Sequence, residues 1–175
     1  MLHFSEDTLT LRDYQERTVQ MHLDAMDLGI HSMLSGIFTG AGKTVIFVEL
    51  ARRCDGRTLI ICPMRELVWQ AVDKVNTLTS STADIEMADF VADRDWPAKI
   101  VVASKQTLLS RRGGELRYKS FDGFRLVIVD EAHTMCSEAV VSMLQHFVDG
   151  GAMVAGFTAT PFRTDGTPMM AEGVA

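Results

Sequence analysis

The stretch SMLSGIFTGAGKT, residues 32–44, decides the fold of this chain. An apolar run typical of a β-strand, residues 32–38, leads into a glycine-rich segment, and residues 45–53 follow with a helical pattern. Strand, glycine-rich loop and helix in this order are the context that a phosphate-binding loop requires. The glycines let the backbone turn its N–H groups inward, and the helix N-terminus adds partial positive charge. We therefore predict a nucleotide-phosphate site formed by Thr39, Gly40, Ala41, Gly42, Lys43 and Thr44.

Lys43 and Thr44 supply the charged and metal-binding groups of this loop. The Lys43 ammonium can reach the β- and γ-phosphates, and the Thr44 hydroxyl can ligate Mg²⁺. The segment departs from the pattern G-x-x-x-x-G-K-[ST] because Ile37 replaces the first glycine and Phe38 follows it. A bulky ring there could alter the start of the loop, although residues 39–44 are complete. The alternative, a glycine-rich helix start with an incidental lysine, is disfavoured by the order of the three elements.

A second element of a nucleotide-hydrolysing site follows the apolar run LVIV at residues 126–129, where the chain reads Asp130-Glu131-Ala132-His133. An acid directly after a buried strand can hold Mg²⁺, which is the role that we predict for Asp130. The neighbouring Glu131 carboxylate can orient and deprotonate the attacking water. Alone, this sequence could be a polar strand cap, but the preceding phosphate loop favours the catalytic interpretation.

The rest of the chain alternates between apolar, β-branched runs and stretches of helical periodicity. This alternation predicts an α/β fold with a mostly parallel sheet flanked by helices on both faces. Ligands bind outside the carboxyl ends of the strands in such sheets, and TGAGKT, PMREL, SKQTL, DEAH and TATP all follow predicted strands. The predicted strands are residues 32–38, 58–62, 100–104, 126–129 and 152–157 with a weaker one near 85–90, and the predicted helices are residues 11–25, 45–53, 65–78, 105–111 and 137–148, with a polar loop over 112–123.

Composition narrows the class of protein. With 175 residues, 47% hydrophobic and 23% charged, the chain can form one soluble globular domain but hardly two. A net charge of −6 argues against a coat of basic residues, but a narrow track of polar groups can still hold a nucleic-acid backbone. No apolar run approaches the about 20 residues that span a bilayer, and acidic residues stand where a secretory signal is basic. We therefore expect a cytoplasmic location and no membrane partner.

Several residues are predicted to be structural. The helix over residues 11–25 carries a loose apolar face, formed by Tyr14, Val19, Met21 and Met26. The cysteines form no C-x-x-C pair and have no histidine at zinc-finger spacing, so we expect reduced thiols. The three cysteines are Cys54, Cys62 and Cys136. No specific role is predicted for four of the histidines, which are His3, His22, His31 and His146.

Taken together, the two motifs and the segment TATP at residues 158–161 closely resemble those of the superfamily 2 helicases, specifically the DEAH-type branch that includes type III restriction and DEAD-like ATPases. The resemblance covers nearly the whole chain and implies a RecA-like P-loop NTPase domain over residues 1–165. Residues 166–175 then begin a linker or tail. The family binds ATP and Mg²⁺, which implies that Lys43, Asp130 and Glu131 are catalytic and that Thr44 and Asp130 hold the metal.

The resemblance also implies roles for the weaker motifs. In the segment LRDYQ, Arg12 and Gln15 would bind the nucleotide, with Gln15 at the adenine edge. The segments PMRELVWQ and SKQTL match motifs that grip the nucleic-acid backbone, and FTATPFR matches the motif that couples hydrolysis to strand movement. The implied nucleic-acid contacts are Pro63, Arg65, Glu66, Ser104, Gln106 and Thr107, and the implied coupling residues are His133, Thr158 and Thr160.

Structural interpretations of these weaker motifs remain open. Arg65 and Glu66 also fit a solvated helix start, and Gln15 also fits an ordinary helix surface. The hydroxyls of Ser104 and Thr107 also fit polar groups at a helix N-terminus, which is itself a phosphate-binding arrangement. His133 also fits a structural hydrogen-bonding role.

In the family, ATP lies between two RecA-like domains, and the second domain supplies an arginine to the γ-phosphate. Nothing after Phe162 resembles the motifs of that second domain. Because such an arginine is worth roughly 10³–10⁵ in kcat, we expect this chain alone to bind nucleotide, to hydrolyse it weakly and not to unwind. The expected partner is a second RecA-like domain, either in a longer chain, of which this would be a fragment, or in trans.

The sequence therefore predicts the ATP-binding motor domain of an ATP-dependent nucleic-acid helicase, with DNA favoured over RNA because TATPFR and LRDYQ resemble DNA-directed members. A double-strand DNA translocase shares every motif. A non-catalytic ATP-binding module is the other alternative, and the intact Glu131 speaks against it. A P-loop kinase or GTPase is disfavoured because PMREL, SKQTL and TATP would have no role there, and because the chain has no guanine-reading N-K-x-D segment.

Overall fold

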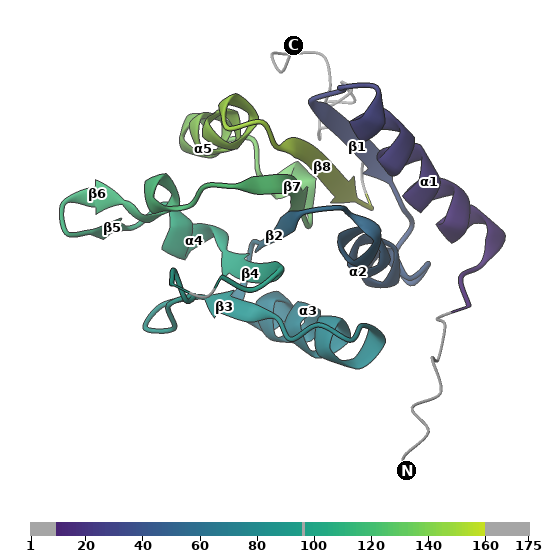
Figure 1. Ribbon diagram of the computed structural model, residues 1–175, viewed down its shortest axis with the longest axis horizontal. Coiled ribbons are helices and arrows are strands. Elements are labelled where there is room, and N and C mark those ends of the chain that lie inside the picture. The colour runs from purple at the N-terminus through teal and green to yellow at the C-terminus, as the bar shows by residue number, and fades with distance from the viewer. Residues whose placement is uncertain (1–9, 96, 160–175) are drawn as a thin grey trace.

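The computed structural model describes residues 10–95 and 97–159 (Figure 1). Its helices are α1 (Asp13–Asp27), α2 (Lys43–Arg53), α3 (Arg65–Leu78), α4 (Lys105–Leu108) and α5 (Glu138–Asp149), with 3-10 turns η1 (Arg117–Ser120) and η2 (Ala132–Thr134). Its strands are β1 (Ser32–Gly36), β2 (Arg57–Cys62), β3 (Asp84–Glu86), β4 (Ile100–Ser104), β5 (Arg111–Arg112), β6 (Glu115–Leu116), β7 (Phe124–Val129) and β8 (Met153–Thr158).

Six of these strands form one sheet in the order β1-β8-β7-β2-β4-β3, and every pairing in it is parallel. Figure 1 shows α1, α2 and α3 on one side of this sheet and α4 and α5 on the other. The α/β fold with helices on both faces is therefore confirmed. Because all six strands run the same way, their carboxyl ends share one edge of the sheet.

The alternation of side chains along each central strand divides the core into two layers. In β2, Ile60 and Cys62 pack with α1, α2 and α3, whereas Leu59 and Ile61 pack on the opposite face with α5 and η1. Successive side chains of a strand point to opposite faces, so a strand covered on both sides must be apolar throughout. This requirement explains why TLIIC and LVIV are uninterrupted apolar runs.

The predicted helix over residues 105–111 is present but shorter, and the predicted polar loop over residues 112–123 contains a hairpin. Helix α4 ends at Leu108, and β5 and β6 form a short antiparallel hairpin that projects from the domain (Figure 1). Gly113 and Gly114 connect these strands with φ of 60° and 90°. Two consecutive positive φ angles suit a two-residue hairpin turn, which a Gly-Gly pair adopts without steric cost.

Helix α1 buries only part of the predicted apolar face, and Met26 of that face packs against the core. Val19 is in the core, but Met21 and Tyr14 are exposed, and the buried polar positions are Gln15 and His22. The His22 ring stacks on Phe157 of β8 at a centroid distance of 5.1 Å, so this histidine is part of the core. Residues spaced by three or four positions share a helix face, which places Gln15, Val19 and His22 in one row.

Two further features of the described residues bear on the sequence analysis. None of their helices is both long and apolar enough to cross a membrane. All three cysteines are free thiols, with Cys54 and Cys62 buried and Cys136 exposed.

Candidate nucleotide-binding site

The predicted phosphate loop connects β1 to the N-terminus of α2 at the carboxyl edge of the sheet. Gly40 and Gly42 adopt φ of 81° and 78°, a left-handed conformation that favours glycine. A Cβ atom on Gly42 would lie 2.6 Å from Nε2 of Gln15, so a side chain there would clash as well as strain the backbone. Gly42 is the N-cap of α2, and the first N–H groups of a helix have no partner within the helix, so they face the loop as possible donors to a ligand.

Two side chains of α1 hold this loop. Nε2 of Gln15 donates to the Ala41 carbonyl at 3.1 Å, and the Tyr14 hydroxyl donates to the same carbonyl at 2.5 Å. The other end of the Gln15 amide accepts the Arg12 backbone N–H at 2.9 Å. Gln15 thus joins the start of α1 to the loop, while the Arg12 side chain is exposed. The sequence analysis missed Tyr14, although a tyrosine hydroxyl at the edge of a core commonly finds such a partner.

Lys43 lies between the two acidic residues of the DEAH segment. Its Nζ is 3.1 Å from Oδ1 of Asp130, and it also donates a hydrogen bond to Glu131. Burial alone would lower the pKa of Lys43, but these two carboxylates outweigh burial and raise it. The ammonium is therefore held in its charged form, as a phosphate-binding lysine must be.

Asp130 and Glu131 leave the end of β7 in different directions. The Asp130 N–H donates to the Ile61 carbonyl of β2 at 2.9 Å, so Asp130 continues the strand and its side chain is buried. Burial raises the pKa of Asp130, and the charge of Lys43 opposes this shift only in part. Glu131 has φ of 49° and ψ of 50°, a left-handed conformation that costs a non-glycine residue of order 1–3 kcal/mol. Such strain is typical of functional sites.

His133 connects this acidic pair to the last strand. Its Nδ1 lies 2.9 Å from Oγ1 of Thr158 and 3.3 Å from Oε2 of Glu131. Thr158 is fully buried, and its carbonyl accepts the N–H of Ile37 at 2.8 Å. The structure thus brings His133 and Thr158 together beside the phosphate loop. The third predicted coupling residue, Thr160, lies outside the described residues.

The predicted nucleic-acid contacts lie at the carboxyl ends of β2 and β4, which are neighbours in the sheet. Ser104 and Thr107 are buried there, and their hydroxyls are bonded within the fold: Ser104 caps α4, and Oγ1 of Thr107 accepts the Ala88 N–H at 2.9 Å. These two hydroxyls therefore have the structural role that the sequence left open, as polar groups bonded within the fold at the start of a helix. Pro63 is buried at the start of the turn into α3, and the exposed members of the set are Arg65, Glu66 and Gln106.

The residues available for a metal are few. No group of three or more histidine, cysteine or acidic side chains that could hold a metal ion occurs within residues 10–95 and 97–159. Mg²⁺ in phosphate sites commonly uses only one or two protein ligands, with phosphate oxygens and water completing its shell. One buried carboxylate, Asp130, and one hydroxyl, Thr44, fit that pattern, in which the metal is bound together with the nucleotide.

Comparison with known proteins agrees with this geometry. The family model described as "Type III restriction enzyme, res subunit" matches residues 8–163. The chain is 32% identical over 174 residues to a putative mitochondrial ATP-dependent helicase, irc3, of Schizosaccharomyces pombe, a match that covers 93% of this chain and 28% of that protein. It is 30% identical over 164 residues to the DNA 3'-5' translocase XPB2 of Sulfurisphaera tokodaii, which covers 92% of this chain and 33% of the translocase.

The fold is also found among solved structures. The SWI2/SNF2 ATPase core of Sulfolobus solfataricus, solved in complex with double-stranded DNA, superposes with a TM-score of 0.70 at 17% identity, covering 91% of this chain and 34% of that one. The chain thus spans about a third or less of these relatives. With the family model matching well over half of its residues, the chain belongs to the type III restriction enzyme res subunit family, whose fold here is the N-terminal RecA-like domain of superfamily 2 helicases.

Proposed function

We propose that this chain is the ATP-binding motor domain of an ATP-dependent DNA helicase. The observation that carries the proposal is the meeting of Lys43, Asp130 and Glu131 beside a left-handed, glycine-dependent phosphate loop. Phosphoryl transfer needs little covalent chemistry from the protein, and depends on positioned charges of this kind. The names of the two relatives, an ATP-dependent helicase and a DNA translocase, support the same assignment.

Each residue of the site then has a distinct role. The backbone of residues 39–44 and the Lys43 ammonium would hold the phosphates of the nucleotide. Thr44 and Asp130 would hold Mg²⁺, which when bound would neutralise the charge that develops on the phosphates. Glu131, which is part exposed, would orient the attacking water and accept its proton. Burial of Asp130 disfavours its charged form, so a dication beside it would be a strong stabilising partner.

The remaining assignments connect this site to its partners. The contact of His133 with both Glu131 and Thr158 suits a coupling role between the nucleotide and the last strand, together with Thr160. Arg12 and Gln15 would lie at the adenine, with Gln15 also bracing the loop. Arg65, Glu66 and Gln106 remain the accessible candidates for nucleic-acid contact, and a second RecA-like domain would complete the site.

A double-strand DNA translocase is the second candidate function. It is favoured by the likeness to XPB2, named as a translocase, and by the fold shared with an ATPase core bound to double-stranded DNA. Strand-displacement and ATP-hydrolysis assays on the longer protein separate the two, because a translocase hydrolyses ATP on DNA without releasing a strand. A cytoplasmic location remains a prediction, since the name of one relative places it in mitochondria.

The test of the proposed chemistry is single-turnover hydrolysis of ATP by excess chain, with and without Mg²⁺, in the wild type and in Glu131→Gln. We expect slow, Mg²⁺-dependent hydrolysis that the substitution lowers by about 10²–10⁴-fold, the range for loss of a general base. Glu131→Gln keeps the size and most hydrogen-bonding capacity of the side chain. Equal hydrolysis by both proteins would place the chemistry elsewhere.

A further inference from the structure

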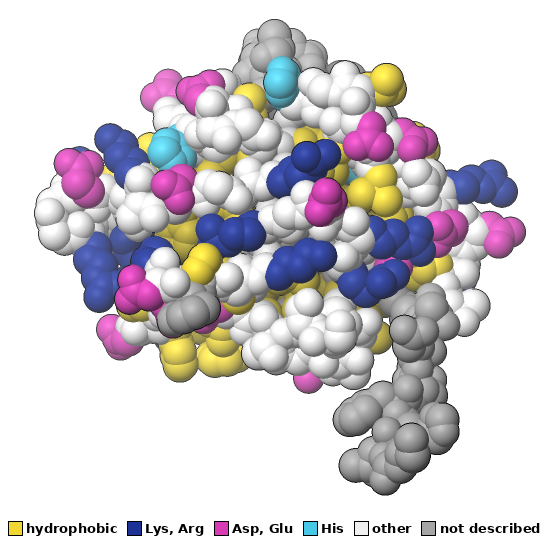
Figure 2. Space-filling view, in the orientation of Figure 1, with side chains coloured by type: hydrophobic (Ala, Val, Ile, Leu, Met, Phe, Trp, Pro, Cys, Tyr) yellow, Lys and Arg dark blue, Asp and Glu magenta, His cyan; other side chains and the backbone are white. Residues whose placement is uncertain are grey.

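A pocket of about 270 Å³ lies beneath the β5–β6 hairpin, away from the phosphate loop. Four cations and two carboxylates form its charged lining: Arg94, Arg112, Arg117, Lys119, Glu86 and Glu115. Figure 2 shows Lys and Arg side chains at the end of the molecule where the hairpin projects, with Asp and Glu side chains among them and further Lys and Arg side chains across the same face. The pocket is therefore a basic site on a chain whose net charge is −6.

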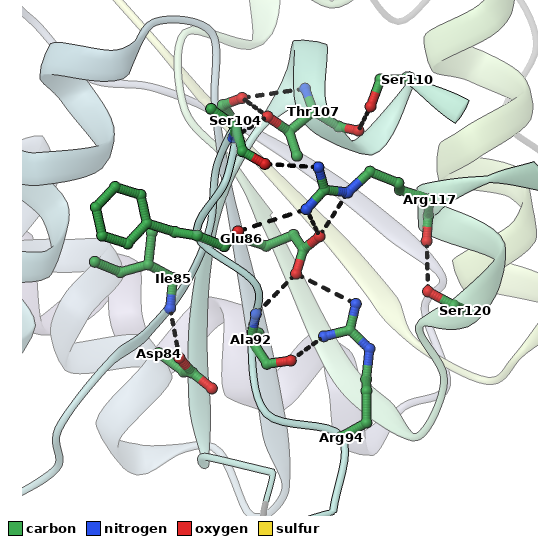
Figure 3. Close-up of polar contacts among 12 residues, drawn as sticks. Asp84, Ile85, Glu86, Ala92, Arg94, Ser104, Thr107, Ser110, Arg117 and Ser120 are labelled. Carbon is green, nitrogen blue, oxygen red and sulfur yellow. Dashed lines mark hydrogen bonds and ion pairs between the residues drawn. The ribbon is translucent and has the colours of Figure 1, made fainter. Parts of the chain in front are cut away.

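The carboxylate at the base of the pocket is already neutralised by the fold. Glu86 is fully buried and accepts Nε of Arg117 at 2.8 Å, Nη2 of Arg94 at 3.2 Å and the Ala92 N–H at 2.9 Å (Figure 3). Nη2 of Arg117 donates to the same carboxylate. With its oxygens saturated in this way, Glu86 does not compete for the cations nearer the surface.

The two cations nearer the surface, Arg112 and Lys119, have no close carboxylate partner within the described residues. The Arg112 side chain is exposed, and no hydrogen bond or ion pair joins it to another side chain in the described parts of the chain, although its backbone pairs with that of Glu115 across the hairpin. Lys119 and Glu115 approach only to 3.8 Å, with side chains 53% and 75% exposed, so water screens their attraction. Arg111 instead donates to the Gly114 carbonyl at 2.5 Å and steadies the hairpin turn. The pocket thus carries an excess of positive charge, with Arg112 on the hairpin and Lys119 on η1.

The pocket is joined to the edge of the sheet that carries the accessible nucleic-acid candidates. Nη1 of Arg117 donates to the Ala88 carbonyl at 2.8 Å, and the Ala88 N–H donates to Oγ1 of Thr107 in α4. The Arg117 N–H closes the base of the hairpin on the Ser110 carbonyl at 2.9 Å. The hairpin therefore holds a fixed position immediately after α4, the helix that carries Gln106.

We propose that this pocket binds a phosphate of the DNA backbone through Arg112 and Lys119, so that the nucleic-acid track continues past α4 onto the hairpin. The inference rests on the proposed function. Guanidinium and ammonium groups are the side chains that recognise phosphates, and phosphate contacts position a nucleic acid without reading its sequence. A Cβ atom on either glycine of the hairpin turn would meet no atom within 4 Å, so the turn leaves open space for a backbone to approach.

The test is the salt dependence of DNA binding, measured by fluorescence anisotropy with a labelled DNA duplex that carries a single-stranded tail. The full chain is compared with the double variant Arg112→Ala/Lys119→Ala. Each lost phosphate contact lowers the slope of log K against log salt by about 0.7–0.9, so we expect the double variant to lose about twice that. The control is the double variant Arg17→Ala/Lys74→Ala, which removes two exposed cations outside the pocket. It changes the net charge by the same amount and is expected to leave the slope unchanged.

The outcomes separate this inference from the function on which it rests. A reduced slope in the pocket variant alone, restored by Arg112→Lys/Lys119→Arg, supports the inference. If the wild type binds DNA, and the pocket variant and the control show the same slope of log K against log salt as the wild type, the inference is overturned and the proposed function is unaffected. A folded wild-type chain that binds Mg²⁺-nucleotide but no DNA overturns both the pocket and the DNA-directed function. Because both side chains are exposed, thermal melting is expected to show an unchanged fold.

Discussion

Two clusters in this domain join carboxylates to cations, and they differ in how completely the carboxylates are satisfied. Glu86 is fully buried and receives donors from Arg94, Arg117 and a backbone N–H. Asp130 and Glu131 share the single ammonium of Lys43, and the Glu131 side chain is 28% exposed on a strained backbone.

The difference separates a structural ion pair from one that is suited to a ligand. A carboxylate has about four acceptor positions, and Glu86 uses them within the fold, whereas Asp130 and Glu131 retain capacity for a metal and for water. Removing a partner should therefore affect stability in the first cluster and ligand binding in the second. The following predictions test that contrast.

The largest expected effect is on the folding of Arg117→Ala. The substitution leaves the buried Glu86 carboxylate with much weaker compensation, which typically costs about 3–5 kcal/mol. Urea unfolding at neutral pH measures the loss. The control is Arg112→Ala, whose exposed side chain has no internal partner and whose substitution should stay within about 0.5 kcal/mol. A loss below about 1 kcal/mol in Arg117→Ala would contradict a structural role for the first cluster.

A smaller effect, on nucleotide affinity, is expected from Gly42→Ala. The added Cβ meets Gln15 at 2.6 Å, and a left-handed alanine costs roughly 1–2 kcal/mol, so the loop should shift and affinity fall by about tenfold or more. Titration with a fluorescent nucleotide measures this change. Gly29→Ala is the matched control, since Gly29 also has a positive φ but open space around it, so it should lose stability without losing affinity. Equal affinities in wild type and Gly42→Ala would count against the loop geometry.

A third prediction concerns His22, a polar core group that belongs to neither cluster. Burial lowers the pKa of His22, and its hydrogen bond to the Thr18 carbonyl opposes this only in part. The unfolded chain, with a histidine pKa of about 6.5, binds the proton more readily, so stability should fall as the pH drops below about 6.5. Unfolding by urea at pH 8 and pH 5.5 should show a flatter dependence in His22→Phe than in the wild type. Identical dependence in the two proteins would mean that His22 does not drive it.

The smallest expected effect is that of Phe38→Ala, at the position where the phosphate-loop pattern is broken. The Phe38 ring is 84% exposed, so the substitution should change stability by no more than about 0.5 kcal/mol and leave nucleotide affinity close to that of the wild type. The same unfolding and titration measurements check both. A marked gain of affinity would show that the ring obstructs the loop, as the sequence alone left open.

Local patterns were sufficient to locate the candidate nucleotide site. The segments TGAGKT and DEAH each follow a β-strand, and a parallel sheet necessarily brings such strand ends to one edge. The contact between Lys43 and Asp130 is thus a consequence of topology that the sequence already contains. The hairpin could also have been predicted, because Gly113-Gly114 is a recognised turn signal.

Other features depend on partners that no local pattern reveals. The Thr107 hydroxyl is bonded to Ala88, whose N–H is presented by the turn after an edge strand, so its internal role was not distinguishable from phosphate binding. Glu86 likewise pairs with Arg117, a residue far from it in the sequence, so no local pattern predicts the contact. Gln15 and His22 are buried because they lie on the face of α1 that packs against the domain. Since both are polar, the buried face does not appear in the sequence as a helical spacing of apolar residues.

The most direct test of the account is the affinity for ADP by calorimetry, with and without Mg²⁺, in the wild type and Lys43→Ala, with Lys74→Ala as the control for charge. The account predicts Mg²⁺-dependent binding in the wild type and in the control, and loss of that binding in Lys43→Ala, with all three proteins folded. Binding of equal strength in Lys43→Ala, or no binding by the folded wild type, would contradict it.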